Sequence, residues 1–310
     1  MRRELVVAKA EQCIAAGSKS FAVASRLFTA RTRESAIMLY AWCRYCDDLI
    51  DGQILGYGQA VGKRDDGLRQ LELLEQSTQS AIAGTPSNNA VFIGLAEVLQ
   101  RHEIAGHYPL EHLAGYRMDV NNVRYDSFDT TLDYCWRVAG VVGVMMSMVM
   151  GRRDAVTLDR ASDLGMAFQL TNIARDVVED AAIDRVYLPR DWLQAEGILS
   201  AAHILENHRR AALGRVATRL VDAAEPYYFS AGRGIAALPL RSAWSIATAR
   251  GVYRNIGQKV KFHGPTAWDQ RVQSSRAAKL WFVASGAALA LTAPMFPAAP
   301  RSASLWTRPH

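Results

Sequence analysis

The chain has 310 residues, of which 50% are hydrophobic and 21% are charged, a balance that is typical of a soluble globular protein with a large core. This composition excludes a disordered chain and a protein built from many membrane spans. The formal net charge of +6 suits an anionic substrate or lipid, and no zinc-finger spacing, RNP signature or dense basic helix indicates nucleic acid as a partner.

Apolar residues recur with helical spacing, and no sustained stretch alternates Val, Ile or Thr with polar residues. The sequence therefore predicts an all-α protein. Gly, Pro, Asn or Asp mark expected breaks at residues 84–90, 184–191, 237–240 and 263–265. None of these breaks is long enough to separate domains. We expect one domain over residues 1–293, then a tail over 294–310 whose Pro, Ala and Ser content is typical of disorder.

The N-terminal residues and the cysteines indicate the cellular compartment in which we expect the protein. The chain starts with Met, Arg, Arg and Glu and lacks the apolar core of a signal peptide, so we expect a cytoplasmic protein. Four scattered cysteines, at positions 13, 43, 46 and 135, do not form a disulfide framework and fit a reducing compartment. Cys43 and Cys46 form a CxxC, but no second pair completes a zinc site, so buried structural thiols are the favoured interpretation.

The segment YAWCRYCDDLID, residues 40–51, carries the first acidic motif. On a helix, Asp47 and Asp51 lie four residues apart on one face. Two carboxylates roughly 5.5 Å apart repel each other by about 3 kcal/mol at an effective dielectric of 20, so the pair favours a bound cation. A solvated acidic face is the alternative interpretation, but Trp42 and Leu49 make this a largely apolar helix.

The next segment of note, residues 138–150, is hydrophobic on all sides. It is too short to cross the roughly 30 Å of a bilayer, so it predicts a buried core helix. Its Gly140 and Gly143 would allow a neighbouring helix or a long apolar ligand to approach closely.

A second acidic motif lies in FQLTNIARDVVED, residues 168–180. Asn172, Asp176 and Asp180 recur every four residues and form one polar stripe on an otherwise apolar helix. Like charges at this spacing would destabilise an exposed helix. Oxygen ligands without histidine are the donors that Mg²⁺ selects, because it takes its remaining ligands from water and substrate phosphates. Two such stripes across a cavity predict a diphosphate site.

Arginines beside the acidic motifs could take the rest of the diphosphate charge. Arg44 comes three residues before Asp47, Arg175 adjoins Asp176, and RVYLP at residues 185–189 follows the second stripe. The guanidinium fork matches phosphate oxygens.

A second apolar run covers residues 280–296, with Arg276 and Lys279 before it and Pro294 within it. A final helix packed on the bundle is the favoured interpretation. A peripheral membrane contact is the second, because basic residues flank the run, and a true membrane span is the least favoured.

With both acidic stripes identified, the sequence resembles the squalene and phytoene synthase family of head-to-head prenyl transferases. The resemblance runs from Gly17 to about Gly264. It rests on five motifs in order: GSKSF at 17–21, CRYCDDLID at 43–51, YCWRVAGVVG at 134–143, QLTNIARDVVED at 169–180 and RVYLP at 185–189. It implies the all-α isoprenoid synthase fold, a helical bundle around a central apolar cavity in which Mg²⁺, or Mn²⁺ in its place, bridges two aspartate-rich helices to diphosphate.

The resemblance also implies roles for individual residues. The metal ligands would be Asp47, Asp51, Asn172, Asp176 and Asp180. The catalytic residues would be the four aspartates of this set and Tyr134. Tyr134 and the released diphosphate are both candidate proton acceptors. The contacts to the isoprenoid diphosphate would be Ser18, Ser20, Phe21, Tyr40, Arg44, Gln169, Asn172, Arg175, Tyr187 and Tyr253.

The implied reaction is a magnesium-dependent prenyl transfer. One allylic diphosphate ionises, the double bond of a second substrate captures the carbocation, and a cyclopropylcarbinyl diphosphate then rearranges to a triene. Ser25, one helical turn after Phe21, is small and would leave a deep substrate pocket. This favours geranylgeranyl diphosphate as substrate and phytoene as product, in carotenoid biosynthesis, over farnesyl diphosphate and a squalene or dehydrosqualene product.

No glycine-rich nucleotide loop follows a strand, so we expect no NADPH. Two other classes stay open on the residues alone. A metal-dependent phosphohydrolase could use both acidic stripes, although it would not need so much apolar wall. A helical membrane-surface protein would explain the basic charge but would leave the stripes without a role.

Overall fold

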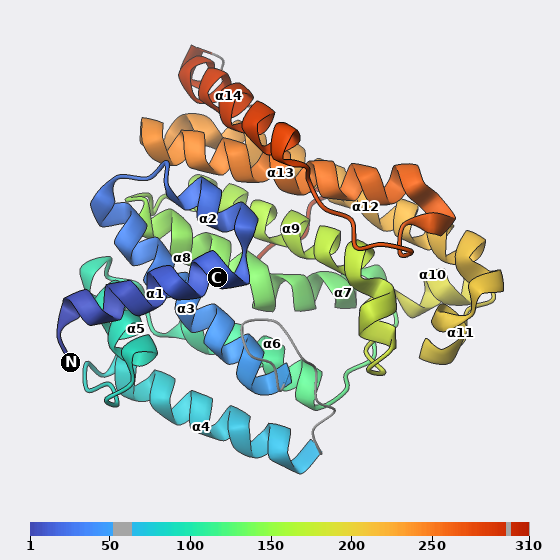
Figure 1. The fold of residues 1–310 in the computed structure, drawn as a ribbon, viewed down its shortest axis with the longest axis horizontal. Helices are drawn as coiled ribbons and strands as arrows, with labels where there is room; N and C mark the ends of the chain where they lie inside the picture. Colours follow the sequence, from blue (N-terminus) through green and yellow to red (C-terminus); the bar gives the residue numbers. More distant parts are fainter. Residues whose placement is uncertain (52–63, 296–298, 310) are drawn as a thin grey trace.

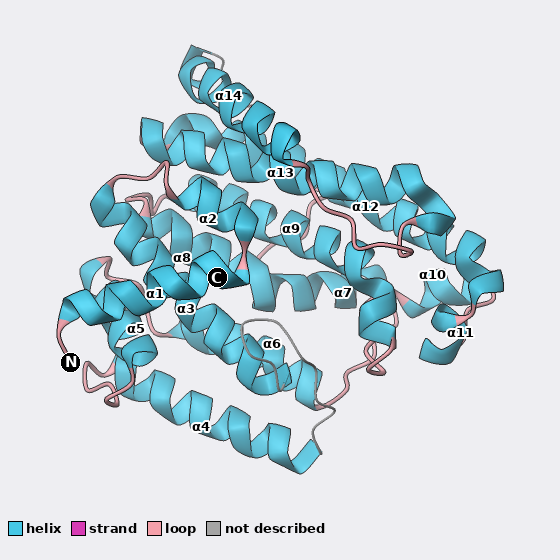
Figure 2. Ribbon diagram, viewed as in Figure 1, coloured by secondary structure: helices cyan, strands magenta, loops and turns pink. Residues whose placement is uncertain are grey.

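The computed structural model describes residues 1–51, 64–295 and 299–309, and within these ranges it does not describe the side chains of Asp51, Arg64 and Asp65. Every regular element in this part of the chain is a helix, as Figure 2 shows. The prediction of an all-α protein is confirmed.

The longer helices follow one another with short connections. They are α1 (Arg3–Gly17), α2 (Lys19–Ser25), α3 (Ala30–Asp51), α4 (Arg64–Ile82), α5 (Ala90–Arg101), α6 (His107–Val120), α7 (Phe128–Cys135), a π-helical turn (Trp136–Gly140), α8 (Val141–Val149), α9 (Ala155–Ala181), α10 (Arg190–Ala195), α11 (Ala201–Leu205), α12 (Arg210–Gly234), α13 (Leu240–His263) and α14 (Arg276–Thr292). Each of the four predicted breaks covers a boundary between two of these helices and overlaps the end of one of them by one or two residues.

Polar side chains fix where several helices begin. Asp154 accepts a hydrogen bond from the Thr157 backbone N at 2.9 Å and starts α9, the helix that carries the second acidic stripe. This bond lowers the pKa of Asp154. Ser127 and Thr130 form a capping box at α7, and Ser18 caps α2 by accepting from the Phe21 backbone N. These caps satisfy backbone N–H groups that the first helical turn leaves without partners.

Two apolar clusters make up most of the core. One lies around α9 and α12, with Leu170 and Leu220 at its centre, and the other lies around α3, α5 and α8, with Trp42 and Leu95 fully buried. Figure 1 shows α9 between the α12–α13 layer and the helices α3 and α6. Phe21 packs against both clusters, so the clusters meet at the motif GSKSF, residues 17–21.

The apolar segment 138–150 is a core helix, as predicted. By length and composition, the continuous helix Phe128–Val149 could cross a membrane, but 61% of its most apolar window is buried inside the protein. Gly143 brings it against α9, because a Cβ at this position would lie 2.2 Å from the Ala161 carbonyl oxygen. The expected close approach of a neighbouring helix is therefore confirmed at this glycine.

The thiols of the CxxC are structural. Cys46 is fully buried, and burial raises the pKa of Cys43 to about 12 and that of Cys46 well above its usual value. A thiol must lose its proton to bind metal, so these two are poor ligands. The interpretation of a buried structural thiol is confirmed for Cys46, whereas Cys43 is only partly buried.

The last long helix, α14, packs on α13. Trp244 Nε1 donates to the Val283 carbonyl at 2.7 Å, and Gly286 lies against Thr248. Helix α14 also has the length and composition of a membrane span, and only 11% of its most apolar window is buried inside the protein. Figure 1 shows it on the outer side of α13, so the favoured interpretation of a helix packed on the bundle is confirmed.

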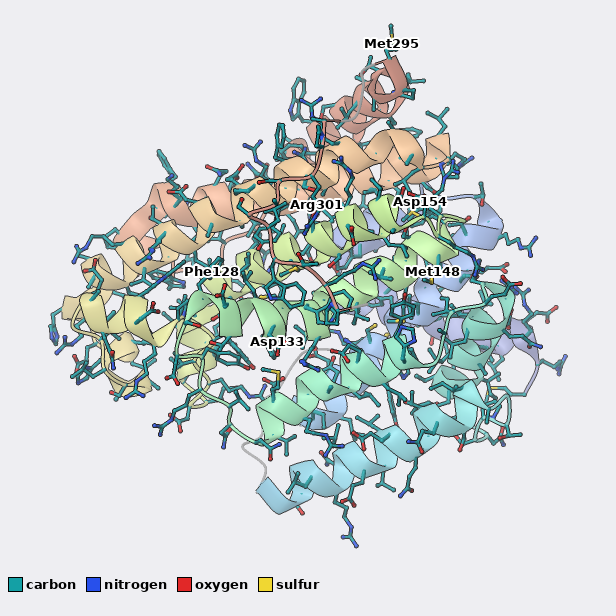
Figure 3. The ribbon with its side chains drawn as sticks, turned by 180° about the vertical axis from the view of Figure 1, so that it is seen from behind. Phe128, Asp133, Met148, Asp154, Met295 and Arg301 are labelled. Carbon is teal, nitrogen blue, oxygen red and sulfur yellow. The ribbon has the colours of Figure 1, made fainter. Side chains whose placement is uncertain are left out.

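The tail beyond α14 makes specific contacts, although its composition is typical of disorder. Over residues 299–309, Leu305 is buried in the core around α9, and Arg301 and Arg308 form ion pairs with aspartates of that helix. Figure 3 labels Arg301 on this tail, where it crosses the back of the bundle. Trp306 also packs against both core clusters, so two arginines, a leucine and a tryptophan anchor this segment.

Candidate active site

A cavity of about 310 Å³ lies between α2, α3, α8, α9 and α13. One face of α9 supplies its long wall, since lining residues recur every three or four positions from Thr157 to Asn172. The body of the cavity is apolar. Its side chains include Phe21, Phe28, Leu39, Val138, Val142, Met146, Met150, Leu164, Phe168, Leu238 and Ile246.

One end of this cavity is polar. Tyr40, Arg44 and Asp47 reach it from successive turns of α3, and Gln169 and Asn172 reach it from α9. The fold therefore brings Asp47 of the first motif and Asn172 of the second to one chamber, whereas Asp176 and Asp180 do not line it. The helical spacing of each motif places its polar side chains on the face that meets the cavity.

Three buried polar atoms at this end have no hydrogen-bond partner in the described part of the chain: Tyr40 Oη, Arg44 Nε and Asn172 Oδ1. Burial raises the pKa of Tyr40 to about 12, although the Arg44 charge opposes this shift. The phenol is therefore neutral and can donate. Since buried polar atoms are nearly always paired, two donors and one amide oxygen fit an anion and a cation at this end.

The carboxylates of both motifs are held by arginines. Arg44 Nη1 donates to Asp47 Oδ2 at 2.6 Å. Arg175 Nε donates to Asp176 Oδ1 at 2.7 Å, and Arg271 Nη2 donates to Asp176 Oδ2 at 3.1 Å. Arg175, predicted as a diphosphate contact, thus forks onto its neighbour in the sequence and does not line the cavity. Arg271 was missed, because the loop before α14 carries no motif.

The other predicted ligands lie at the ends of their helices. Asp180 follows Asp176 by one turn on α9 and lies close enough to raise the pKa of Tyr187, after the larger effects of burial and Asp119. Asp51 is the last residue of α3, and its side chain lies outside the described part of the structure. Among the side chains that are described, no three of His, Cys, Asp or Glu converge as a metal cage.

Tyr134 and Tyr187 form a cluster with a residue that the sequence analysis missed. Both hydroxyls donate to Asp119, at 3.2 and 3.0 Å, and the two rings stack with centroids 4.7 Å apart. Burial, followed by the Asp119 charge, raises both tyrosine pKa values well above their usual range. Neither tyrosine lines the cavity. Asp119 was missed because a single acidic residue without a repeat gives no pattern.

Aromatic rings form the wall next to the polar end. Phe21 stacks on Tyr253 with centroids 5.2 Å apart, and Tyr253 stacks on Phe168 at 4.3 Å. Phe21 and Tyr253 were predicted as substrate contacts, and both line the cavity. Ring faces attract cations, so this wall suits a positively charged intermediate.

Helix α2 contributes the predicted serines in two ways. Ser25 lines the cavity, is only 4% exposed, and donates its hydroxyl to the Ala22 carbonyl at 3.1 Å. Ser18 caps the helix, and neither Ser18 nor Ser20 lines the cavity. The sequence therefore located the serine that borders the apolar chamber.

Two further lining residues were missed. His112 is fully buried, and burial lowers its pKa to about 4, so its imidazole is neutral at pH 7. Arg160 lies on the α9 wall, three positions after Thr157 and toward the end remote from Asp47. No repeat or spacing in the sequence marks either residue as part of a site.

Known proteins resemble this chain along most of its length. The sequence model of the squalene/phytoene synthase family matches residues 14–278. The chain is 51% identical over 300 residues to the 15-cis-phytoene synthase of Pantoea ananas, with 97% of each chain covered. It is 44% identical over 306 residues to the 15-cis-phytoene synthase of a Paracoccus species, with 98% of each covered. A crystal structure of a dehydrosqualene synthase superposes with a TM-score of 0.82 at 26% identity, over 92% of this chain and 96% of that one.

Proposed function

Because the chain belongs to the squalene/phytoene synthase family, we propose that it is a phytoene synthase, a prenyltransferase of carotenoid biosynthesis that condenses two geranylgeranyl diphosphates head to head. Relatives that are about half identical over nearly the whole chain carry this name. The observation that carries the proposal is the cavity, whose polar end holds Asp47 of the first motif, Asn172 of the second and unpartnered polar atoms, and whose body is apolar.

We propose that Mg²⁺, or Mn²⁺ in its place, binds between the two motifs, with Asp47, Asp51, Asn172, Asp176 and Asp180 as the residues that hold it. The support is the unpartnered Asn172 Oδ1 and the oxygen-only donor set, which suits a hard cation that takes its other ligands from water and phosphate. Bound there, the metal would neutralise the diphosphate as it leaves the allylic carbon.

The residues of the chain bind, orient and shield the reacting groups. Tyr40 Oη and Arg44 Nε lie at the polar end of the cavity without a well-formed hydrogen bond, and both would donate to diphosphate oxygens. The apolar body of the cavity excludes water, which would otherwise capture the carbocation, and the stacked rings of Phe21 and Tyr253 face the same chamber. The released diphosphate is the proton acceptor in this proposal, since Tyr134 already donates to Asp119 and does not line the cavity.

The length of the chamber supports the twenty-carbon substrate. Asn172 and Thr157 line it fifteen positions apart on α9, which is about 22 Å along the helix axis. The small side chain of Ser25 occupies little of the space beside this wall. A fifteen-carbon substrate would leave part of the apolar surface uncovered, so farnesyl diphosphate is the weaker candidate.

The test of this proposal is product analysis with the purified protein, Mg²⁺ and geranylgeranyl diphosphate, without NADPH. We expect a forty-carbon hydrocarbon and free diphosphate. A phosphohydrolase would instead release the prenyl alcohol, and a helical protein that only binds lipid would leave the substrate intact. Either result would refute the proposal.

We also propose that the protein is cytoplasmic and contacts membranes peripherally through α14. The outer face of this helix exposes Leu280, Trp281 and Leu291, each by more than 60%, and Arg276 and Lys279 lie at its start. Exposed apolar side chains beside basic ones suit an anionic lipid surface. Cosedimentation with anionic vesicles tests this. Replacing Trp281 with Ser should weaken vesicle binding, and undiminished binding would contradict the proposal.

A further inference from the structure

The C-terminal tail, residues 299–309, is tied to α9 by a buried ion pair. Arg301 Nε and Nη2 donate to the two oxygens of Asp163 at 2.9 and 2.7 Å. Asp163 is completely buried, and Ser230 on α12 donates to it as well. Arg301 also donates to the Trp306 carbonyl at 2.6 Å, which folds the tail back on itself. Such a forked, buried pair fixes the tail rather than merely attracting it.

The same network holds a residue of the cavity wall. Arg160 lines the cavity and is 5% exposed. Its Nη1 donates to the Ser230 carbonyl at 3.1 Å, and its Nη2 donates to the carbonyl of Ala299 in the tail. Gly234 on α12 leaves room for the Arg160 stem, because a Cβ there would lie 2.9 Å from Arg160 Cβ. The stem of Arg160 thus forms wall while its charged head is bonded behind the wall.

We propose that the tail 299–309 is a determinant of prenyl chain length, and that Arg301 is a positioning residue that keeps Arg160 in the far wall of the chamber. This inference rests on the proposed function. Without the docked tail, the buried guanidinium of Arg160 loses one of its two acceptors. A buried charge without partners is costly, so the head turns toward water and draws the stem out of the wall.

The position of Arg160 makes the effect depend on substrate length. It lies twelve positions from Asn172 along α9, about 18 Å from the polar end. The last isoprene unit of a geranylgeranyl chain reaches this far wall, whereas a farnesyl chain ends short of it. Loosening Arg160 therefore weakens the hold on the longer substrate and leaves the shorter one nearly unaffected.

The primary test compares Arg301→Ala with Arg308→Ala. Arg308 belongs to the same tail and pairs with Asp159 of the same helix at 2.6 Å, but it lies farther along the tail from Ala299. Arg301 lies two residues from Ala299, and its partner Asp163 accepts from Ser230; the carbonyls of Ala299 and Ser230 are the acceptors of Arg160. The measured quantity is the ratio of kcat/KM for geranylgeranyl diphosphate to that for farnesyl diphosphate. We expect Arg301→Ala to lower the ratio about 10-fold, chiefly through KM, because misfit in an apolar pocket has effects of this order. Arg308→Ala should change it by less than about 2-fold.

A double-substitution cycle removes the alternative of general destabilisation. Arg160→Met keeps an unbranched stem in the wall and removes the head that needs the tail. In that background, Arg301→Ala should have no further effect on the ratio, because the pair would no longer share the network. If Arg301→Ala does not fold at the assay temperature, Arg301→Lys takes its place, because lysine can keep one bond to Asp163. The substrate ratio should then shift in the same direction by a smaller factor.

Three results would overturn the inference: equal losses with both substrates, the same ratio change in Arg308→Ala, or a full effect of Arg301→Ala in the Arg160→Met background. These are distinct from failure of the proposed function. If the unaltered protein makes no forty-carbon hydrocarbon, the function itself is refuted and the inference falls with it. If it makes that product and the ratio does not respond to Arg301→Ala, only the inference is refuted.

Discussion

Replacing Ser25 with Phe should shift the product from forty to thirty carbons. The Ser25 side chain lines the cavity and is almost completely buried, so a benzyl group there must occupy cavity space or displace its neighbours. It adds five heavy atoms to the wall of a cavity of only about 310 Å³. The full twenty-carbon chain would then no longer fit without strain.

Strain of this kind costs about 1–3 kcal/mol, which corresponds to a loss of about 5- to 150-fold in kcat/KM for geranylgeranyl diphosphate relative to farnesyl diphosphate. Steady-state kinetics with each substrate, with products identified by mass, measures this ratio. Ser25→Ala is the matched control, since it removes the hydroxyl bond to Ala22 without filling space, and it should keep the forty-carbon product. A Ser25→Phe variant that makes this product as efficiently as the unaltered protein would refute the volume argument.

Three more predictions follow from the site and its walls. Asp176→Asn should lower kcat by about 100-fold or more and raise the Mg²⁺ concentration needed for half-maximal rate. Titration with Mg²⁺ after its removal by EDTA tests this, and an unchanged metal requirement would count against Asp176 as a ligand. The pKa of buried His112 is lowered to about 4, so the unfolded chain binds a proton first as the pH falls. The free energy of unfolding should therefore drop by up to roughly 3 kcal/mol between pH 6.5 and 4. Urea titrations should show a shallower pH dependence of this free energy in His112→Gln, and an identical slope would exclude His112 as the cause. Gly143→Ala should lower the thermal midpoint, since its Cβ would lie 2.2 Å from a carbonyl of α9 and overpacking costs about 1–3 kcal/mol, whereas Gly67→Ala, with its nearest contacts at 3.4 Å, should not.

The fold and the polar end of the site could be predicted because both depend on short spacings. Asp47 and Asn172 belong to motifs that repeat every four residues, and helical geometry carries that spacing directly onto one face. Ser25 could be located for the same reason, one turn after Phe21. Four helix boundaries were also predicted, since Gly, Pro, Asn or Asp punctuate each of them, whereas the boundaries after α5, α6 and α8 were not.

The remaining features depend on tertiary contacts between residues far apart in the sequence. Asp119 meets Tyr187 across 68 positions, and Arg301 meets Asp163 across 138, so no local pattern indicates either pair. The pairing of Arg175 with Asp176 was also hidden, because adjacent residues on a helix do not normally face each other. In the tail, a composition rich in Pro, Ala and Ser masked the few residues that anchor it.

Competition between substrates tests the central claim most directly. The purified protein, with Mg²⁺ and without NADPH, is given equal concentrations of geranylgeranyl and farnesyl diphosphate, and the hydrocarbons are separated by mass. The chamber described here predicts forty-carbon phytoene as the main product. A mixture dominated by a thirty-carbon hydrocarbon would keep the head-to-head reaction but contradict a chamber built for the longer chain.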